Sequence, residues 1–344
     1  MNPWSVRSFD RADSGLYLDI VRLGYTLFSC ARFPGSDPNQ WCGNAGWMPG
    51  LPILTGLLVD FGMNAREAAF LISNIAFVGC LILLRRLFGQ IAPNRDPRIS
   101  LLIASVFPGG IYFHAVFPIS LLMFFSILSL LLLTQQRFFL ASIVSACGAL
   151  SYATGFLLAG VVGCAAAAAP TVSMTRKLAK AAFYSAIAFS GFLIVLAMHR
   201  IATDHWNAFF LVQAKYGHGL HNPLLSITSV LESVPPEYSA PVKLVVPAQT
   251  LVICAAVLSL FTVMLMRREE ITAIEWLAAI HVFLFWIFPL VMGPGVSPTR
   301  AQANLLPLTL LMARLPQAVQ IPALIVFAAL YFWGSIAFFE SILV

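Results

Sequence analysis

Long runs of apolar residues constrain the fold of this chain more than any other feature of its sequence. Of its 344 residues, 60% are hydrophobic and only 10% are charged, whereas ordinary soluble domains carry about 25% charged residues. A chain of this length cannot hide so much apolar surface from water in one core, so lipid must surround it. The sequence therefore predicts an all-α polytopic membrane protein, a single domain over residues 1–344 with about eight to ten transmembrane helices.

The predicted spans are separated by polar connections, and several of them are short or contain proline. Residues 47–61 are apolar but short and broken by proline, so an interfacial or re-entrant helix suits them better than a span. The predicted spans are residues 66–84, 99–115, 117–134, 138–154, 155–170, 180–198, 243–266, 271–291, 301–315 and 320–341.

Arginine and lysine residues gather at the ends of these segments, and the positive-inside rule assigns such clusters to the cytoplasm. Alternation of the spans then puts residues 1–64, 200–242 and 292–300 on the extracytoplasmic side. No predicted span precedes that N-terminal segment, so either a first transmembrane helix is missing from this chain, which we favour, or the N-terminus is translocated unaided. The net charge of +6 does not indicate nucleic acid binding, because the basic residues mark segment ends. They are Arg85, Arg86, Arg95, Arg98, Arg137, Arg176, Lys177, Lys180, Arg267, Arg268 and Arg314.

The N-terminal region contains the most polar, acid-bearing segment of the chain, Arg11 to Tyr25. Apolar residues at helical spacing from Leu16 onward predict a short amphipathic helix at the membrane surface. Asp13 precedes that helix, where a carboxylate caps the first free N–H groups. It is either an ordinary capping residue or a catalytic carboxylate held at the membrane surface.

Two cysteines, Cys30 and Cys42, share a polar loop and form a disulfide if that loop faces an oxidising compartment. The long loop 200–242 is also expected to carry functional residues. Its His218 and His221 are a weak metal signal, because no acidic residue lies beside them, and solvated histidines are the simpler interpretation. The sequence contains no glycine-rich phosphate loop, nucleophile elbow or zinc-spaced cysteine set.

The predicted spans hold almost no ionisable residues, which argues against a transporter or flippase. His114 is the main exception, near the outer end of its span and beside Pro108-Gly109-Gly110. It is interpreted either as a hydrogen-bonded helix-end histidine or as a substrate contact. The polar residues lie mostly in the predicted outer loops, which indicates chemistry at the outer membrane surface.

The segment around Asp13 resembles the start of GT-C membrane glycosyltransferases, specifically the GPI mannosyltransferase II (PIG-V) family and its bacterial relatives. That family begins, after a first helix, with W-D-x-x-x-[YF]-L-x-I-A-x-x-G-Y. Ala12 and Val21 replace the tryptophan and the alanine of that pattern. The matching positions are Asp13, Tyr17, Leu18, Ile20, Gly24 and Tyr25.

Later segments are similar to the same family in the same order. Residues 47–52 resemble its F-F-P-x-[YF]-P element, and residues 107–122 resemble a segment that ends Y-[ST]-E-S-L, with Ile119 in place of the glutamate. Residues 151–155 resemble an x-T-R-x-x-G element without its arginine. The loop residues 204–217 loosely resemble a bacterial motif, and Ser297-Pro298-Thr299-Arg300 resembles the S-x-x-R-Y that opens a late helix.

This resemblance implies a GT-C-like bundle with short interfacial helices, and an enzyme that moves a sugar, in particular mannose, from a polyprenyl-phosphate donor to an acceptor hydroxyl. Asp13 is then the base that takes the hydroxyl proton, with Asp10 as the fallback because it is expected to be unpaired. Arg300, and second Arg11, would neutralise the leaving phosphate. The remaining implied substrate-binding residues are Tyr17, His114, Asp204 and Gln213.

No metal or cofactor is expected, since the lipid-phosphate sugar is itself the donor substrate. The expected partners are membrane lipid, the sugar donor and a glycan, lipid or protein acceptor, and the expected location is a bacterial inner membrane with the site facing outward. Two alternatives stay open. The first is a non-catalytic subunit or a divergent inactive member of the family, which the missing glutamate and arginine favour. The second is a small-molecule transporter or flippase.

Overall fold

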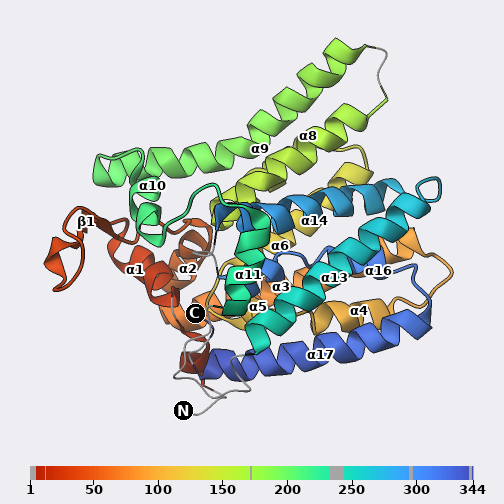
Figure 1. The fold of residues 1–344 in the computed structure, drawn as a ribbon. Coiled ribbons are helices and arrows are strands. Elements are labelled where there is room, and N and C mark those ends of the chain that lie inside the picture. Colours follow the sequence, from red (N-terminus) through yellow and green to blue (C-terminus); the bar gives the residue numbers. More distant parts are fainter. Residues whose placement is uncertain are drawn as a thin grey trace.

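We describe the protein from a computed structural model, which covers residues 5–11, 13–170, 173–232, 244–293, 297–340 and 343. Within these residues the fold is all-α apart from one small antiparallel ribbon of two strands (Figure 1). The ribbon pairs β1 (Leu27–Ser29) with β2 (Trp41–Gly43). The last part of the predicted loop 200–242, with residues 294–296 of the predicted segment 292–300, lies outside the described residues.

Among the residues that the structure describes, five helices are long and apolar enough to cross a membrane. At about 1.5 Å of rise per residue, even a helix of 20 residues spans about 30 Å, the thickness of a bilayer core. The all-α polytopic membrane class is therefore confirmed. The five are α3 (Ala65–Ile91), α9 (Met174–Thr203), α13 (Val245–Met266), α14 (Ala273–Met292) and α17 (Gln317–Phe339).

Shorter elements fill the rest of the bundle and its ends. Three apolar helices, α6 (Ile119–Thr134), α7 (Phe138–Ser151) and α8 (Leu158–Ala168), form a layer with α3 and α9 (Figure 1). The other helices are α1 (Ser14–Leu23), α2 (Gly50–Asp60), α4 (Arg98–Ser105), α5 (Ile111–His114), α10 (Ala208–Gln213), α11 (Pro223–Glu232), α15 (Pro298–Ala303) and α16 (Leu308–Met312), with 3-10 turns η1 (Val6–Phe9), η2 (Cys30–Arg32), η3 (Ala153–Leu157) and η4 (Ala214–Tyr216).

Two predicted spans are wrong as continuous helices. Residues 99–115 divide into α4 and α5, and residues 301–315 fall mostly in α15 and α16. The first break lies at Gly109, which has φ +78°, a conformation that favours glycine. A Cβ at Gly109 would lie 2.6 Å from the carbonyl oxygen of Thr299, so the missing side chain lets α5 and α15 approach closely.

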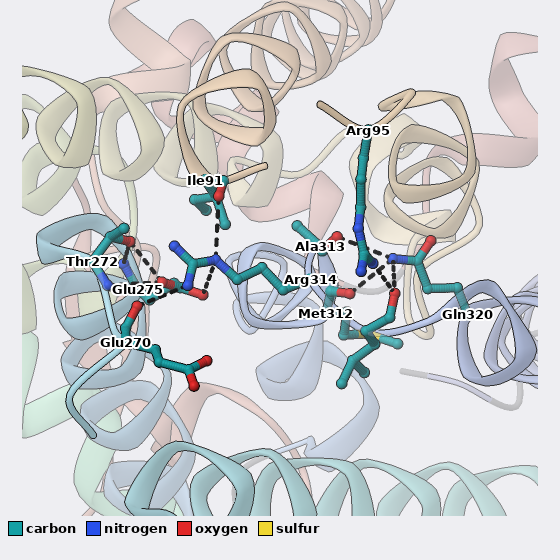
Figure 2. A network of polar contacts seen from close by, with 10 residues as sticks. Ile91, Arg95, Glu270, Thr272, Glu275, Met312, Ala313, Arg314 and Gln320 are labelled. Carbon is teal, nitrogen blue, oxygen red and sulfur yellow. Dashed lines mark hydrogen bonds and ion pairs between the residues drawn. The ribbon is translucent and has the colours of Figure 1, made fainter. Parts of the chain in front are cut away.

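Two of the basic residues, Arg95 and Arg314, join neighbouring segments at one end of the bundle. Arg314 donates to the carbonyl oxygens of Ile91, at 3.2 Å, and Glu270, at 2.7 Å, and forms an ion pair with Glu275 at 3.3 Å. Glu275 also forms a capping box with Thr272 at the start of α14. Figure 2 shows these residues beside Arg95 and Gln320, which point to the carbonyl groups at the end of α16. The loops that follow α3, α13 and α16 are thus joined to one another.

The N-terminal region and α10 lie at the opposite end (Figure 1). The backbone N–H of Val116 donates to the Phe9 carbonyl at 3.1 Å, which ties η1 to the end of α5. Cys30 and Cys42 form a disulfide that closes the loop between the two strands. The sequence left open whether these two cysteines pair, and in the structure they do. The disulfide lies at the end of the bundle away from the arginine network.

Candidate active site

Asp13 stands at the start of the predicted amphipathic helix, which the structure contains as α1. It occupies the N-cap position, yet its side chain makes no capping hydrogen bond. The capping interpretation is therefore wrong for its carboxylate. Asp13 Oδ2 instead accepts a hydrogen bond from Nη1 of Arg300, and the two residues form an ion pair across 287 positions of sequence.

Arg300 is held in place by its short helix, α15. Pro298 stands at the first helical position, where its missing N–H is no loss. The Nε2 of Gln249 on α13 donates to the Thr299 carbonyl at 3.3 Å and to Oε1 of Gln302 at 3.0 Å. Gly109 also lies close to the Thr299 carbonyl, so α13 and the segment before α5 together hold α15 and the guanidinium that it carries.

Aromatic residues form the wall behind the ion pair. The Arg300 guanidinium carbon lies 5.6 Å from the ring centroid of Phe117, a cation–π distance. The Tyr17 and Tyr112 rings contact the same Phe117 edge-on, at centroid distances of 6.2 and 5.8 Å. The Tyr112 and Thr299 hydroxyl oxygens lie 3.3 Å apart. This wall excludes water from one side of the pair and strengthens its electrostatic attraction.

Burial controls the protonation of the groups around the pair. It raises the pKa of the Tyr17 phenol well above its ordinary value, so Tyr17 stays neutral. Burial alone would lower the pKa of the Arg300 guanidinium, but the neighbouring oxygens of Tyr152 and Asp13 reverse this, and its pKa is raised. Arg300 therefore keeps its positive charge at any physiological pH.

The ion pair is still open enough to meet a substrate. The Asp13 side chain is 25% exposed and that of Arg300 is 19% exposed. A carboxylate accepts hydrogen bonds from a hydroxyl, and a guanidinium has five N–H donors. The hydrogen bond to Asp13 uses one of them, on Nη1. The site can therefore receive an acceptor hydroxyl at Asp13 and an anionic oxygen at Arg300.

Two other charged residues near Asp13 have separate partners. Arg11 Nη2 donates to the Phe339 carbonyl at the end of α17, at 3.2 Å, where a cation also complements the helix dipole. Asp10 forms an ion pair with Arg66 at 2.5 Å. The expectation that Asp10 is unpaired is wrong, since the start of α3 supplies a cation that the sequence separates from it by 56 positions.

The remaining predicted substrate contacts do not gather at the ion pair. His114 Nδ1 lies 2.8 Å from Oδ1 of Asn74 on α3, a hydrogen-bond distance. This contact agrees with the interpretation of His114 as a hydrogen-bonded histidine. Asp204 is exposed at the C-terminal end of α9 and is paired with Arg200 at 3.3 Å. Gln213 donates from Nε2 to the Gly46 carbonyl at 2.8 Å, which fastens α10 to the loop before α2. Tyr17 alone of these four packs against the Phe117 wall.

The two loop histidines contact different residues. The His218 ring stacks on Tyr216, at a centroid distance of 6.0 Å, and the His221 ring fits against Gly293, where a Cβ would lie 2.3 Å from it. Among the residues that the structure describes, no group of three or more histidine, cysteine or acidic residues has the arrangement of a metal site.

Two residues of η4, Lys215 and Tyr216, were not predicted to belong to the site, although Tyr216 lies in the loop segment that was compared with the bacterial motif. Asp13 acts electrostatically on both, and the Tyr216 ring packs edge-on against Trp47 at 6.5 Å. A lysine and a tyrosine in a polar loop carry no spacing signal of their own. Tyr152, in the segment compared with the x-T-R-x-x-G element, is half-buried and interacts electrostatically with Arg300, and it was recognisable only through that comparison.

Comparison with known proteins leaves the chain to be interpreted from its own residues. It matches no protein-family model and no curated protein sequence.

Proposed function

We propose that this protein is a membrane glycosyltransferase that moves a sugar, in particular mannose, from a polyprenyl-phosphate donor to an acceptor hydroxyl on the extracytoplasmic side, with Asp13 as the base. The observation that carries the proposal is the ion pair of Asp13 with Arg300. The resemblance of two distant segments to one enzyme family suggested these residues separately, and they meet at the end of the bundle away from the basic clusters.

The chemistry needs few groups from the protein. The Asp13 carboxylate takes the proton of the acceptor hydroxyl as its oxygen forms a bond to the anomeric carbon. The bond from that carbon to the phosphate oxygen breaks through an oxocarbenium-like state, and the phosphate leaves on its lipid carrier. A single displacement of this kind inverts the anomeric configuration. Arg300 stabilises the negative charge that develops on the leaving phosphate.

An apolar groove next to α1 suits a lipid-linked substrate. It is lined by residues of α1, α2 and the end of α9, among them Ile20, Tyr25, Ile53 and Met198. Ile53 and Leu57 of α2 are also exposed, with accessibilities of 48% and 54%. In a membrane these side chains face lipid, so a prenyl chain reaches α1 without crossing water.

Two observations support the side of the membrane that we propose for the site. Basic clusters favour the cytoplasm, and the disulfide between Cys30 and Cys42 lies at the other end of the molecule. Disulfides persist in oxidising compartments such as the bacterial periplasm. We therefore place the ion pair on the outer face of a bacterial inner membrane.

The test is sugar transfer in isolated membranes supplied with polyprenyl-phosphate-mannose. Asp13→Asn keeps the shape of the side chain but cannot accept the hydroxyl proton, so we expect the rate to fall by about 100-fold or more. Asp19→Asn, on the same helix, is the matched control and should keep its activity. Unchanged transfer by the Asp13→Asn protein would eliminate Asp13 as the base.

A second candidate is a non-catalytic subunit or an inactive member of the same family. It is favoured by Ile119, which is fully buried where the family has a glutamate. This alternative predicts no transfer by the wild-type chain alone with any prenyl-phosphate sugar. Detectable transfer that depends on Asp13 would exclude it.

A further inference from the structure

Charge is unevenly balanced in the middle of the chain, where no aspartate or glutamate lies between Asp96 and Asp204. At the two ends of this stretch, Arg98 pairs with Asp96 at 3.5 Å and Arg200 pairs with Asp204 at 3.3 Å. The other four basic residues of the stretch form no ion pair within the part of the chain that the structure describes. They are Arg137, Arg176, Lys177 and Lys180.

The packing of α7 against α9 brings these four residues together. Arg137 is the N-cap residue of α7, and the other three lie in the first two turns of α9. The Phe138 ring stacks on Tyr184 of α9 at a centroid distance of 5.6 Å, and Lys180 Nζ lies 5.9 Å from the centroid of the same Phe138 ring. We call the four residues the basic cluster. Helix α9 ends beside α10, so the cluster lies at the other end of the bundle (Figure 1).

The basic cluster does not stabilise the fold by itself. Residues three or four positions apart are neighbours on a helix, and like charges at these spacings, as at Arg176, Lys177 and Lys180, repel one another. Cations in the first turn also oppose the helix dipole, and α9 has no acidic residue there. Membrane orientation accounts for basic residues at this end, but it does not account for their convergence on the Phe138 and Tyr184 rings. An anion from outside the chain would relieve the repulsion.

Exposed apolar side chains lie beside the basic cluster. Met174, Leu178 and Phe183 of α9 are 68%, 57% and 57% exposed. In a membrane such side chains contact acyl chains, and a tyrosine such as Tyr184 is typical of the boundary between lipid and water. A surface with cations at the boundary and apolar side chains next to them complements an amphiphile with an anionic head better than it complements a free phosphate ion.

We propose that the basic cluster binds the headgroup of an anionic phospholipid in the membrane leaflet at this end of the bundle. Basic residues at a membrane surface attract anionic headgroups. Arg137 and Lys180 approach the phosphate from α7 and α9, so the headgroup joins the two helices, and the acyl chains lie along the exposed face of α9. The site is distinct from the Asp13–Arg300 pair and does not depend on the proposed transfer reaction.

Thermal unfolding of the purified protein in detergent measures this binding, because a ligand of the folded state raises the midpoint temperature, Tm. The additives are cardiolipin, zwitterionic phosphatidylcholine and inorganic phosphate, each at the same concentration. We expect only cardiolipin to raise the Tm of the wild type. In the double variant Arg137→Gln, Lys180→Gln, the apparent affinity for cardiolipin should fall about tenfold or more, because each basic residue near an anionic surface contributes roughly fivefold.

The matched control is the double variant Arg267→Gln, Arg268→Gln. Both arginines are exposed and follow α13, at the end of the bundle where Arg314 donates to the Glu270 carbonyl. This variant removes the same number of charges from the same end, but Glu269 and Glu270 follow these arginines directly. It should keep the wild-type response to cardiolipin.

Two further variants separate binding from stability. Lys180→Gln alone should weaken cardiolipin binding about fivefold, and the charge-preserving variant Arg137→Lys, Lys180→Arg should respond as the wild type does. Each variant is compared with its own Tm in the absence of lipid, so a change in stability is not counted as a change in binding.

Three results would overturn the proposal. The first is an equal response to cardiolipin in the double variants of the cluster and of Arg267 and Arg268. The second is a wild-type response to phosphatidylcholine as large as the response to cardiolipin. The third is an equally large response to inorganic phosphate, which would show a site for a small anion instead of a lipid.

Discussion

Asp13 shows how a single side chain can serve a site rather than its own helix. An aspartate at an N-cap normally stabilises the helix by accepting hydrogen bonds from the first N–H groups. Here that bond is not formed, and the carboxylate turns to a guanidinium contributed by α15. The start of α1 therefore gives up local stabilisation, and the pair gains a carboxylate whose direction is fixed by two helices.

The ion pair should also stabilise the fold. Arg300→Met removes the cation and leaves a carboxylate with a side chain only 25% exposed. We expect it to lower the free energy of unfolding by about 1–3 kcal/mol. The loss is smaller than for a fully buried pair, because both side chains are partly exposed to solvent. Thermal unfolding in detergent measures the effect.

The double variant Asp13→Asn, Arg300→Met is the control for this prediction. It removes both charges, so it should be more stable than Arg300→Met alone. If the two single changes instead add without any coupling, the pair does not contribute to stability.

The sequence predicted some residues of the site and not others, for a physical reason. Asp13 and Arg300 were recognisable because each lies in a segment that resembles a segment of one enzyme family. Lys215 was not, because a lysine in a polar loop is usually solvated, and its surroundings depend on how η4 packs against residues 46 and 47. Asp10 was misjudged for the same reason, since its partner Arg66 comes from another helix.

At the scale of the elements, broken helices place the functional groups. Hydropathy averaged over a window predicted continuous spans at 99–115 and 301–315, because apolar residues flank both breaks. Such an average does not register the backbone conformation of Gly109 or the close approach that it permits. Helix α13 has no break and was predicted to within two residues at its start, because its periodicity and length are local properties of the sequence. Helix α3 starts within one residue of the predicted position but continues to Ile91, past Arg85 and Arg86, at which the predicted span ended.

A methyl group at Gly109 tests this arrangement. Gly109→Ala combines a strained backbone at φ +78° with a Cβ that meets the Thr299 carbonyl oxygen. We expect a loss of about 1–3 kcal/mol in stability, and a larger relative loss of phosphate binding because α15 carries Arg300.

Gly89→Ala is the matched control. Gly89 lies within α3, and a Cβ there meets nothing within 4 Å. Alanine in a helix should be neutral or stabilising by about 1 kcal/mol. Thermal unfolding and farnesyl phosphate titration of both variants measure the difference, and equal behaviour of the two would refute a role for Gly109 in placing α15.

At the scale of the whole molecule, charge and polarity divide the protein into two unlike ends. One end carries the arginine network of Figure 2, and the other carries the disulfide and the Asp13–Arg300 pair. The sequence predicted this division, because basic residues at the ends of apolar segments indicate which ends lie on the same side. It did not predict which outer residues meet, since those contacts depend on how the helices pack.

Single cysteines test the orientation. Leu220 is 90% exposed near the site end, and Glu269 is exposed in the turn between α13 and α14 at the other end. In a background without other cysteines, Leu220→Cys should react with a membrane-impermeant maleimide on intact cells. Glu269→Cys should react only after the membrane is opened. The reverse pattern would place the ion pair in the cytoplasm.

The distance along the chain between Asp13 and Arg300 has a consequence for biosynthesis. The two residues are separated by 287 positions, and a ribosome that adds about 5–20 residues per second needs roughly 15–60 s to make that stretch. During this time the translocon must release almost every helix before the arginine arrives. A nascent chain therefore exposes its aspartate to the lipid interface without a counter-ion, and the pair can close only at the end of insertion.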